Sequence, residues 1–86
     1  MKIIFHKTFQ KKLKKQANVE RVQLQNRLDI FVSDPFNVIL NNHALRGAFT
    51  GYRSINVSGD LRAIYRIESN DIALFTDIDN HANLYK

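Results

Sequence analysis

The stretch Tyr52-Arg53-Ser54-Ile55-Asn56-Val57-Ser58-Gly59-Asp60-Leu61-Arg62-Ala63-Ile64-Tyr65-Arg66-Ile67 decides the fold. Its two halves are rich in β-branched and aromatic residues, and Ser58-Gly59-Asp60 between them is typical of a hairpin turn. Residues 68–71 (ESND) predict a second turn, and 72–78 (IALFTDI) a strand that starts apolar on both faces, as a central strand does. We therefore expect a β-meander with strands over 52–57, 61–67 and 72–78.

Towards the amino terminus, a short strand precedes a basic helix. Residues 2–6 predict the strand. Thr8 can cap a helix over about 9–17, because its hydroxyl can accept a hydrogen bond from a free amide of the first turn. Phe9 and Leu13 are four residues apart, so one face of this helix packs inward while its lysines point outward.

A second helix is expected over about 19–33, with Asn18 as the break and cap before it. Its apolar residues recur at helical spacing and form one buried stripe: Leu24, Leu28 and Phe31. Asp34-Pro35 ends it, because the residue before proline is disfavoured in the helical region. Residues 36–51 are expected to be irregular.

The order β-α-α-β-β-β predicts an α+β fold, with an antiparallel sheet and a helical hairpin packed on one face. With 86 residues, we expect a single domain over 1–86 with a modest core and a shallow surface site. Cysteine is absent and no pair of histidines has zinc-motif spacing, so neither a metal nor a cofactor is expected. No apolar run is long enough for a signal peptide or a membrane span, which makes the cytoplasm the default location.

The charge is unevenly distributed. The net charge is +5, and six lysines precede the first acid, Glu20: Lys2, Lys7, Lys11, Lys12, Lys14 and Lys15. A basic patch attracts polyanions by long-range electrostatics, so nucleic acid or an acidic protein is one interpretation. A solvated helix face that keeps the protein soluble is the other, and composition alone does not choose between them.

Polar residues converge at one end of the predicted meander. Consecutive strands are antiparallel neighbours, so Asn56, Asp60, Arg62 and the segment 79–81 should share that end. These residue types suit RNA cleavage, in which the 2′-hydroxyl is the nucleophile and a histidine such as His81 can transfer a proton. Arginine offers a planar fork of donors for the phosphate.

Each of these residues also has a structural explanation. Asp60 follows glycine in a turn, where aspartate is common. Arg62 and Arg66 could form the solvent face of a half-buried strand, and Tyr85 could cover the core. His81 could be an exposed loop residue, and His6 is expected only to end a strand. The predicted convergence, more than any single residue, favours a functional site.

Four segments resemble the RelE/ParE superfamily of toxins, and most closely its YafQ-like branch. They are His43-Ala44-Leu45-Arg46-Gly47, Tyr52-Arg53-Ser54-Ile55, Asp60-Leu61-Arg62-Ala63-Ile64-Tyr65-Arg66-Ile67 and Asp79-Asn80-His81-Ala82-Asn83-Leu84-Tyr85. The family forms are H-x-L-x-G, a "dlRliY" strand and a closing G-x-H-x-x-L-[FY]. The match is detailed over about half the chain and extends only as a pattern to the amino-terminal half.

The resemblance implies a ribosome-dependent mRNA endonuclease that a cognate antitoxin, encoded by an adjacent gene, holds inactive. The working residues of the YafQ-like branch carry over to His43, Asp60, His81 and Tyr85, and the catalytic arginine of the RelE branch carries over to Arg62. Three departures are evident. Asn56 replaces a histidine that could transfer protons, Leu61 replaces a tryptophan, and Asp79-Asn80 replaces the usual G-x.

Our leading hypothesis is therefore a metal-independent endoribonuclease. His81 would act as general acid or base with Asp60, Arg62 would stabilise the phosphate, His43 and Asn56 would position it, and Tyr85 would stack on the substrate. The residues expected to bind mRNA or ribosomal RNA are Lys7, Lys11, Lys12, Lys14, Lys15, Arg46 and Arg53. The alternatives are a ParE-like gyrase inhibitor without nuclease activity, which the same fold would support, and a degenerate member that only binds its antitoxin.

Overall fold

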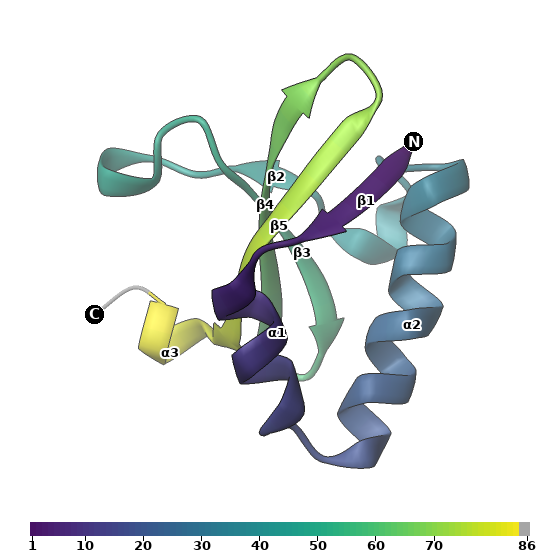
Figure 1. The fold of residues 1–86 in the computed structure, drawn as a ribbon, viewed down its shortest axis with the longest axis vertical. Helices are drawn as coiled ribbons and strands as arrows, with labels where there is room; N and C mark the ends of the chain where they lie inside the picture. The colour runs from purple at the N-terminus through teal and green to yellow at the C-terminus, as the bar shows by residue number, and fades with distance from the viewer. Residues whose placement is uncertain (85–86) are drawn as a thin grey trace.

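A computed structural model describes residues 1–84 and confirms the predicted α+β class. Its elements, drawn in Figure 1, are β1 (Lys2–Phe5), α1 (Lys7–Lys14), α2 (Asn18–Ser33), the 3₁₀ turn η1 (Val38–Leu40), β2 (His43–Ala44), the 3₁₀ turn η2 (Gly47–Phe49), β3 (Arg53–Ser58), β4 (Leu61–Ser69), β5 (Ile72–Asn80) and α3 (His81–Leu84). The strands form one sheet in the order β1-β5-β4-β3-β2.

The predicted meander is present. β3, β4 and β5 pair antiparallel in sequence order, and β4 and β5 each continue two residues beyond the predicted ends, to Ser69 and Asn80. The turn between β3 and β4 is tight, and Gly59 adopts φ +49°, a left-handed conformation that glycine reaches without a Cβ clash. A bulge at Thr76 shifts the register of β5 against β4, so that Ile64 pairs with Asp77 and Tyr65 with Phe75.

Two features of the sheet differ from the sequence prediction. β1 pairs parallel with β5, so the sheet is mixed rather than wholly antiparallel. The connection from β1 to β5 contains the α1–α2 hairpin and the strands β2 to β4, and a connection of this length allows the two strands to pair in parallel. Residues 36–51 were expected to be irregular, but His43 and Ala44 form β2 against Ser54 and Arg53. A two-residue strand has no periodicity that a sequence pattern could reveal.

Both helix caps also differ from prediction. α1 begins at Lys7, and the Nδ1 atom of His6 accepts a hydrogen bond from the Thr8 amide at 3.1 Å, so His6 is the cap in place of Thr8. Asn18 is the first residue of α2, which has Ala17 at its N-cap and no side-chain capping bond there. Both helices therefore start earlier than the sequence predicted.

One core holds the elements together. α2 covers one face of the sheet, while α3 and the segment 45–52 lie on the other side of it (Figure 1). Phe9 of α1, Phe31 of α2 and Phe75 of β5 are fully buried, and the ring of Phe75 contacts those of Phe9, Phe31 and Tyr65. The hydroxyl of Tyr65 accepts a hydrogen bond from the Asn42 amide at 2.7 Å, which satisfies its polar end.

Within 1–84, no helix is long and apolar enough to cross a membrane.

Candidate active site

Three polar residues form a row across β3, β4 and β5 near one end of these strands. Asn56 of β3 pairs with Arg62 of β4, and Arg62 pairs with Asp79 of β5. Cross-strand partners have Cα atoms about 4.5–5.5 Å apart, and side chains alternate between faces along a strand. Because the neighbouring residues Ile55 and Ala63 face the core, this row lies on the face opposite α2. The convergence predicted from the meander is thereby confirmed.

The turn after β3 and the tail after β5 meet at the end of this row. The backbone amide of His81 donates to the carbonyl oxygen of Asp60 at 2.9 Å, and Leu61 pairs with Asn80. Asp60 and His81 are both exposed, while Leu84 is buried and anchors the short α3 that His81 begins. The geometry thus brings a carboxylate and an imidazole to one solvent-accessible corner.

The guanidinium of Arg62 is held at the same corner. Its Nη1 atom donates to the carbonyl oxygens of Gly59 at 2.8 Å and Leu61 at 3.1 Å. A guanidinium has five N–H donors, so these two bonds orient the group and leave donors for a phosphate. The β3–β4 turn therefore positions the arginine against its own backbone.

Asp79 is the most connected residue of the corner, and the sequence did not reveal this role. Its carboxylate accepts from the Asn80 amide at 2.8 Å, the Asn83 side chain at 3.0 Å and the Lys12 ammonium at 3.2 Å. The bond from Asn83, followed by those from Asn80 and Lys12, lowers the pKa of Asp79 below its ordinary value of 3.8, against the opposing effect of burial. Asp79 thus connects β5, α3 and α1, at a position where the G-x-H form of the RelE/ParE toxins has glycine.

Lys12, which the sequence predicts to bind RNA, also has partners within the fold. Its ammonium lies 2.8 Å from Asp77 and 3.2 Å from Asp79. The hydrogen bond to Asp77 is the main reason why the pKa of Lys12 is raised above its ordinary 10.5. Arg53, another predicted RNA-binding residue, likewise has partners within the protein, because its Nε donates to Asn42 at 2.8 Å and its guanidinium lies over the ring of Phe36.

Of the other predicted site residues, Asn56 belongs to the row and His43 lies beside it. The Oδ1 atom of Asn56 is buried without a hydrogen-bond partner among residues 1–84, as is the hydroxyl of Ser54 two residues earlier. His43 pairs with Ser54 of β3. Ser54 lies two residues before Asn56, which at 3.3–3.4 Å per residue is about 7 Å along the strand, so His43 is a neighbour of the row and not a member of it. Its Nδ1 lies 2.8 Å from the Asn41 carbonyl oxygen, which can only accept, so Nδ1 carries a proton.

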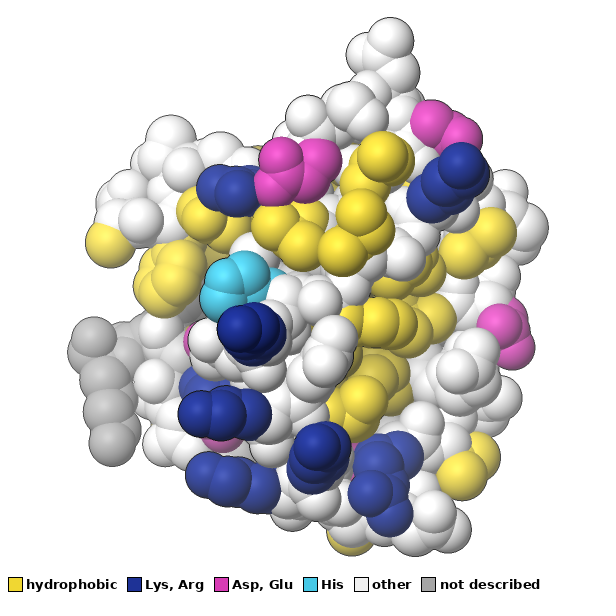
Figure 2. Space-filling model, in the orientation of Figure 1, with side chains coloured by type: hydrophobic (Ala, Val, Ile, Leu, Met, Phe, Trp, Pro, Cys, Tyr) yellow, Lys and Arg dark blue, Asp and Glu magenta, His cyan; other side chains and the backbone are white. Residues whose placement is uncertain are grey.

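The remaining predicted cations are exposed: Lys7, Lys11, Lys14, Lys15 and Arg46. Figure 2 shows Lys and Arg side chains gathered over α1 and the start of α2, on one part of the visible face. A strip of hydrophobic side chains runs beside them, between the two helices. Tyr85, the predicted stacking residue, lies outside the described residues.

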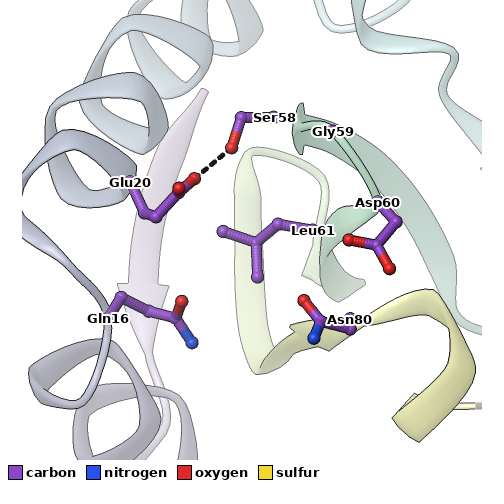
Figure 3. Close-up of a pocket in the computed structure, with 7 residues that line it drawn as sticks. All are labelled: Gln16, Glu20, Ser58, Gly59, Asp60, Leu61 and Asn80. Carbon is purple, nitrogen blue, oxygen red and sulfur yellow. Dashed lines mark hydrogen bonds between the residues drawn. The ribbon is translucent and has the colours of Figure 1, made fainter.

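A pocket adjoins the corner and was not predicted. It lies between the α1–α2 connection, the β3–β4 turn and the end of β5 (Figure 3). Its lining residues are Gln16, Glu20, Ser58, Gly59, Asp60, Leu61 and Asn80. The only sequence signal for it was the position of Asp60 and Asn80 at the converging strand ends. Among residues 1–84, no group of three or more His, Cys, Asp or Glu side chains is placed to hold a metal ion.

Several solved structures resemble this one. YafQ from E. coli strain BL21(DE3) has a TM-score of 0.78 at 22% identity, covering 98% of this chain and 97% of that chain. YafQ in the E. coli DinJ-YafQ toxin-antitoxin complex has a TM-score of 0.79 at 20% identity, with 98% and 96% covered. The YoeB/ParE toxin from Agrobacterium tumefaciens has a TM-score of 0.76 at 18% identity, with 94% and 99% covered. At such identities these likenesses show the fold alone.

The family relationship comes from the sequence itself. No curated protein sequence matches the chain. The family model of YafQ, described as a bacterial toxin of a type II toxin-antitoxin system, matches residues 1–86. The chain therefore belongs to the YafQ family of toxins of type II toxin–antitoxin systems.

Proposed function

We propose that the protein cleaves mRNA on the ribosome by attack of the RNA's own 2′-hydroxyl, and thereby inhibits translation. The observation that carries this proposal is the corner at which Asp60, Arg62 and His81 meet, closed by the hydrogen bond between the turn and the tail. A carboxylate, a guanidinium and an imidazole are the groups needed to remove a proton, stabilise a phosphorane and return a proton.

The proposed step needs no external nucleophile. Of His81 and Asp60, one takes the proton of the 2′-hydroxyl and the other delivers a proton to the leaving oxygen. The 2′-oxygen bonds to phosphorus while the bond from phosphorus to the 5′-oxygen breaks and that oxygen is protonated. Arg62 stabilises the charge that builds on the phosphate oxygens. The products are a 2′,3′-cyclic phosphate, or the 3′-phosphate formed when it opens, and a 5′-hydroxyl.

Asn56 and His43 are proposed to position the substrate for this step. The Oδ1 atom of Asn56 is shielded from solvent, so a substrate contact would use its amide nitrogen, which donates and cannot act as a base. In a neutral His43, the Nδ1 proton leaves Nε2 as an acceptor for a sugar hydroxyl. We propose both as positioning residues, and propose that Tyr85 stacks on the substrate.

The basic surface is proposed to bind ribosomal and messenger RNA. Lys7, Lys11, Lys14 and Lys15 extend from α1 or its end into solvent, and Arg46 is exposed before η2. Exposed cations that contact phosphates supply affinity that depends on salt but not on base sequence. This surface would hold the protein on the ribosome while the corner acts on the message.

A cognate antitoxin is the proposed protein partner. The solved relatives include E. coli DinJ-YafQ and Mycobacterium tuberculosis RelBE2 toxin-antitoxin complexes. In this protein, the basic side chains over α1 border a hydrophobic strip between α1 and α2 (Figure 2). A flexible antitoxin segment with acidic and apolar residues would complement both surfaces and fold on binding.

The experiment is single-turnover cleavage of a defined mRNA on purified ribosomes. His81→Ala and Arg62→Ala should each lower the rate, by roughly 10²–10⁴-fold for loss of the acid–base group and by about 10²–10³-fold for loss of one phosphate donor. Arg66→Ala is the matched control, since Arg66 lies on the same strand and face four residues away. Full activity of both corner variants, or gyrase inhibition without RNA cleavage, would refute the proposal.

A further inference from the structure

We infer that the pocket beside the corner binds a nucleobase that carries an exocyclic amine, and that it disfavours uracil. This inference rests on the proposed function and deepens it by assigning a base preference to a specific set of residues. The pocket has a volume of about 360 Å³. That is enough for a single base, since small-molecule pockets range from roughly 300 to 1,000 Å³.

The pocket is fixed in shape by contacts within its walls. The hydroxyl of Ser58 donates a short hydrogen bond to the Glu20 carboxylate, which joins the first turn of α2 to the end of β3 (Figure 3). On the opposite wall, the His81 amide donates to the Asp60 carbonyl oxygen and joins the turn to the tail. A base would therefore enter a preformed site, and its binding would require little reorganisation of the protein.

Three polar side chains in this pocket are not engaged. The side chains of Gln16, Asp60 and Asn80 have no hydrogen-bond partner among residues 1–84, and Figure 3 shows their polar ends directed towards the space beside Leu61. Leu61, which is 4% exposed, closes the floor of the pocket. Unengaged polar groups around such a pocket are the arrangement that binds the polar edge of a planar base.

The polar groups are mostly acceptors. Glu20 and Asp60 offer carboxylate oxygens, which only accept, while Gln16 and Asn80 each offer one carbonyl oxygen and one amide donor. Two carboxylates would repel a phosphate, so the base rather than the backbone enters the pocket. Adenine, cytosine and guanine each present an amine to such acceptors, whereas the exocyclic groups of uracil are two carbonyl oxygens, which the carboxylates repel.

The pocket also lies where a base next to the cut would be. Asp60 lines it and belongs to the catalytic corner, and Asn80 lines it and immediately precedes His81. A nucleotide whose phosphate contacts Arg62 is thus adjacent to the pocket through the same β3–β4 turn. We accordingly assign the preference to a nucleotide flanking the cleaved bond.

Two isosteric variants test this assignment through cleavage rates on a set of mRNAs that differ only in the bases around the cut. In the wild type, uridine at one fixed position should lower kcat/KM by roughly 5- to 150-fold relative to amine-bearing bases. Glu20→Gln keeps the bond from Ser58 but adds a donor, so it should reduce this discrimination. Asn80→Asp replaces a donor with an acceptor and should increase it.

Glu68→Gln, at the far end of β4, is the matched control and should leave the base ranking unchanged. Identical rankings in the wild type, Glu20→Gln and Asn80→Asp would overturn the inference, as would the absence of any bias against uridine. Nucleoside 5′-monophosphates provide a readout that does not require cleavage. AMP should shift the amide resonances of residues 16, 20, 59–61 and 80 at lower concentration than UMP. Equal shifts from both, or none at those residues, would overturn the inference even if the protein cuts no RNA.

Discussion

Replacing Asp79 by asparagine tests whether the contacts around this residue hold the tail against the body of the protein. The substitution preserves shape and one carbonyl acceptor but removes the charge that faces Lys12. Asp79 accepts three hydrogen bonds, and its side chain is 26% exposed. Bonds to charged groups contribute about 1.5–3 kcal/mol when buried and exposed ion pairs about 0.2–1 kcal/mol, so we expect a loss of about 1 kcal/mol.

The sign of the pH dependence follows from the lowered pKa of Asp79. A carboxyl whose folded-state pKa is below its ordinary 3.8 stabilises the fold above that value, and this contribution disappears as pH falls through the folded-state pKa. Lys12, whose pKa is raised above 10.5, keeps its contribution at every pH below that value. The destabilisation by Asp79→Asn should therefore be constant between about pH 5 and 9 and vanish in strong acid.

The assay is urea and thermal unfolding of both proteins from pH 2.5 to pH 8, followed by circular dichroism. A loss of about 1 kcal/mol corresponds to a Tm lower by about 4–8 °C in a protein of this size. Asp71→Asn is the control, because its carboxylate is 72% exposed and forms its ion pair with the N-terminus at a distance of 3.5 Å. Equal stability at neutral pH, or an undiminished deficit at pH 2.5, would refute the reasoning.

Four further substitutions separate structural from RNA-binding roles. His6→Ala should destabilise the protein by about 0.5–2 kcal/mol in urea unfolding because it removes the cap of α1, and a larger effect of Thr8→Ala would contradict the assigned cap. Arg53→Gln should lower the Tm by breaking the bond to Asn42 and leave the salt dependence of ribosome binding unchanged; an altered salt slope would show an RNA contact. Lys14→Gln and Lys15→Gln should each reduce that slope by roughly 0.7–0.9 without changing the Tm, and an unchanged slope would exclude the residue concerned from the RNA-binding surface.

Local signals predicted most of the fold because they arise from neighbours along the chain. The alternation in β3, the apolar start of β5 and the helical spacing of Leu24, Leu28 and Phe31 placed these elements to within two residues of their observed bounds. The parallel pairing of β1 with β5 depends on segments about 70 residues apart, whose register Lys2↔Ile72 sets. No local pattern encodes such a pairing.

The candidate site also contains some features that local patterns predicted and others that depend on tertiary packing. Asn56, Arg62 and the tail were predicted to meet because a meander dictates which strand ends are neighbours. The bond from Lys12 to Asp79 joins residues 67 positions apart, so the sequence patterns that suggested an RNA-binding role for Lys12 could not predict this contact. The pocket was missed for the same reason, since Gln16 and Glu20 reach the corner only through the packing of the helical hairpin.

We propose that RNA is cut by its own 2′-hydroxyl at the corner formed by Asp60, Arg62 and His81. The most direct measurement uses a ribosome-bound mRNA with a single 2′-deoxynucleotide on the 5′ side of the mapped cut. The unmodified message should yield a 2′,3′-cyclic phosphate or 3′-phosphate and a 5′-hydroxyl, and the deoxy message should remain intact at that bond. Cleavage of the deoxy message at the same bond, or products with a 5′-phosphate, would contradict the account.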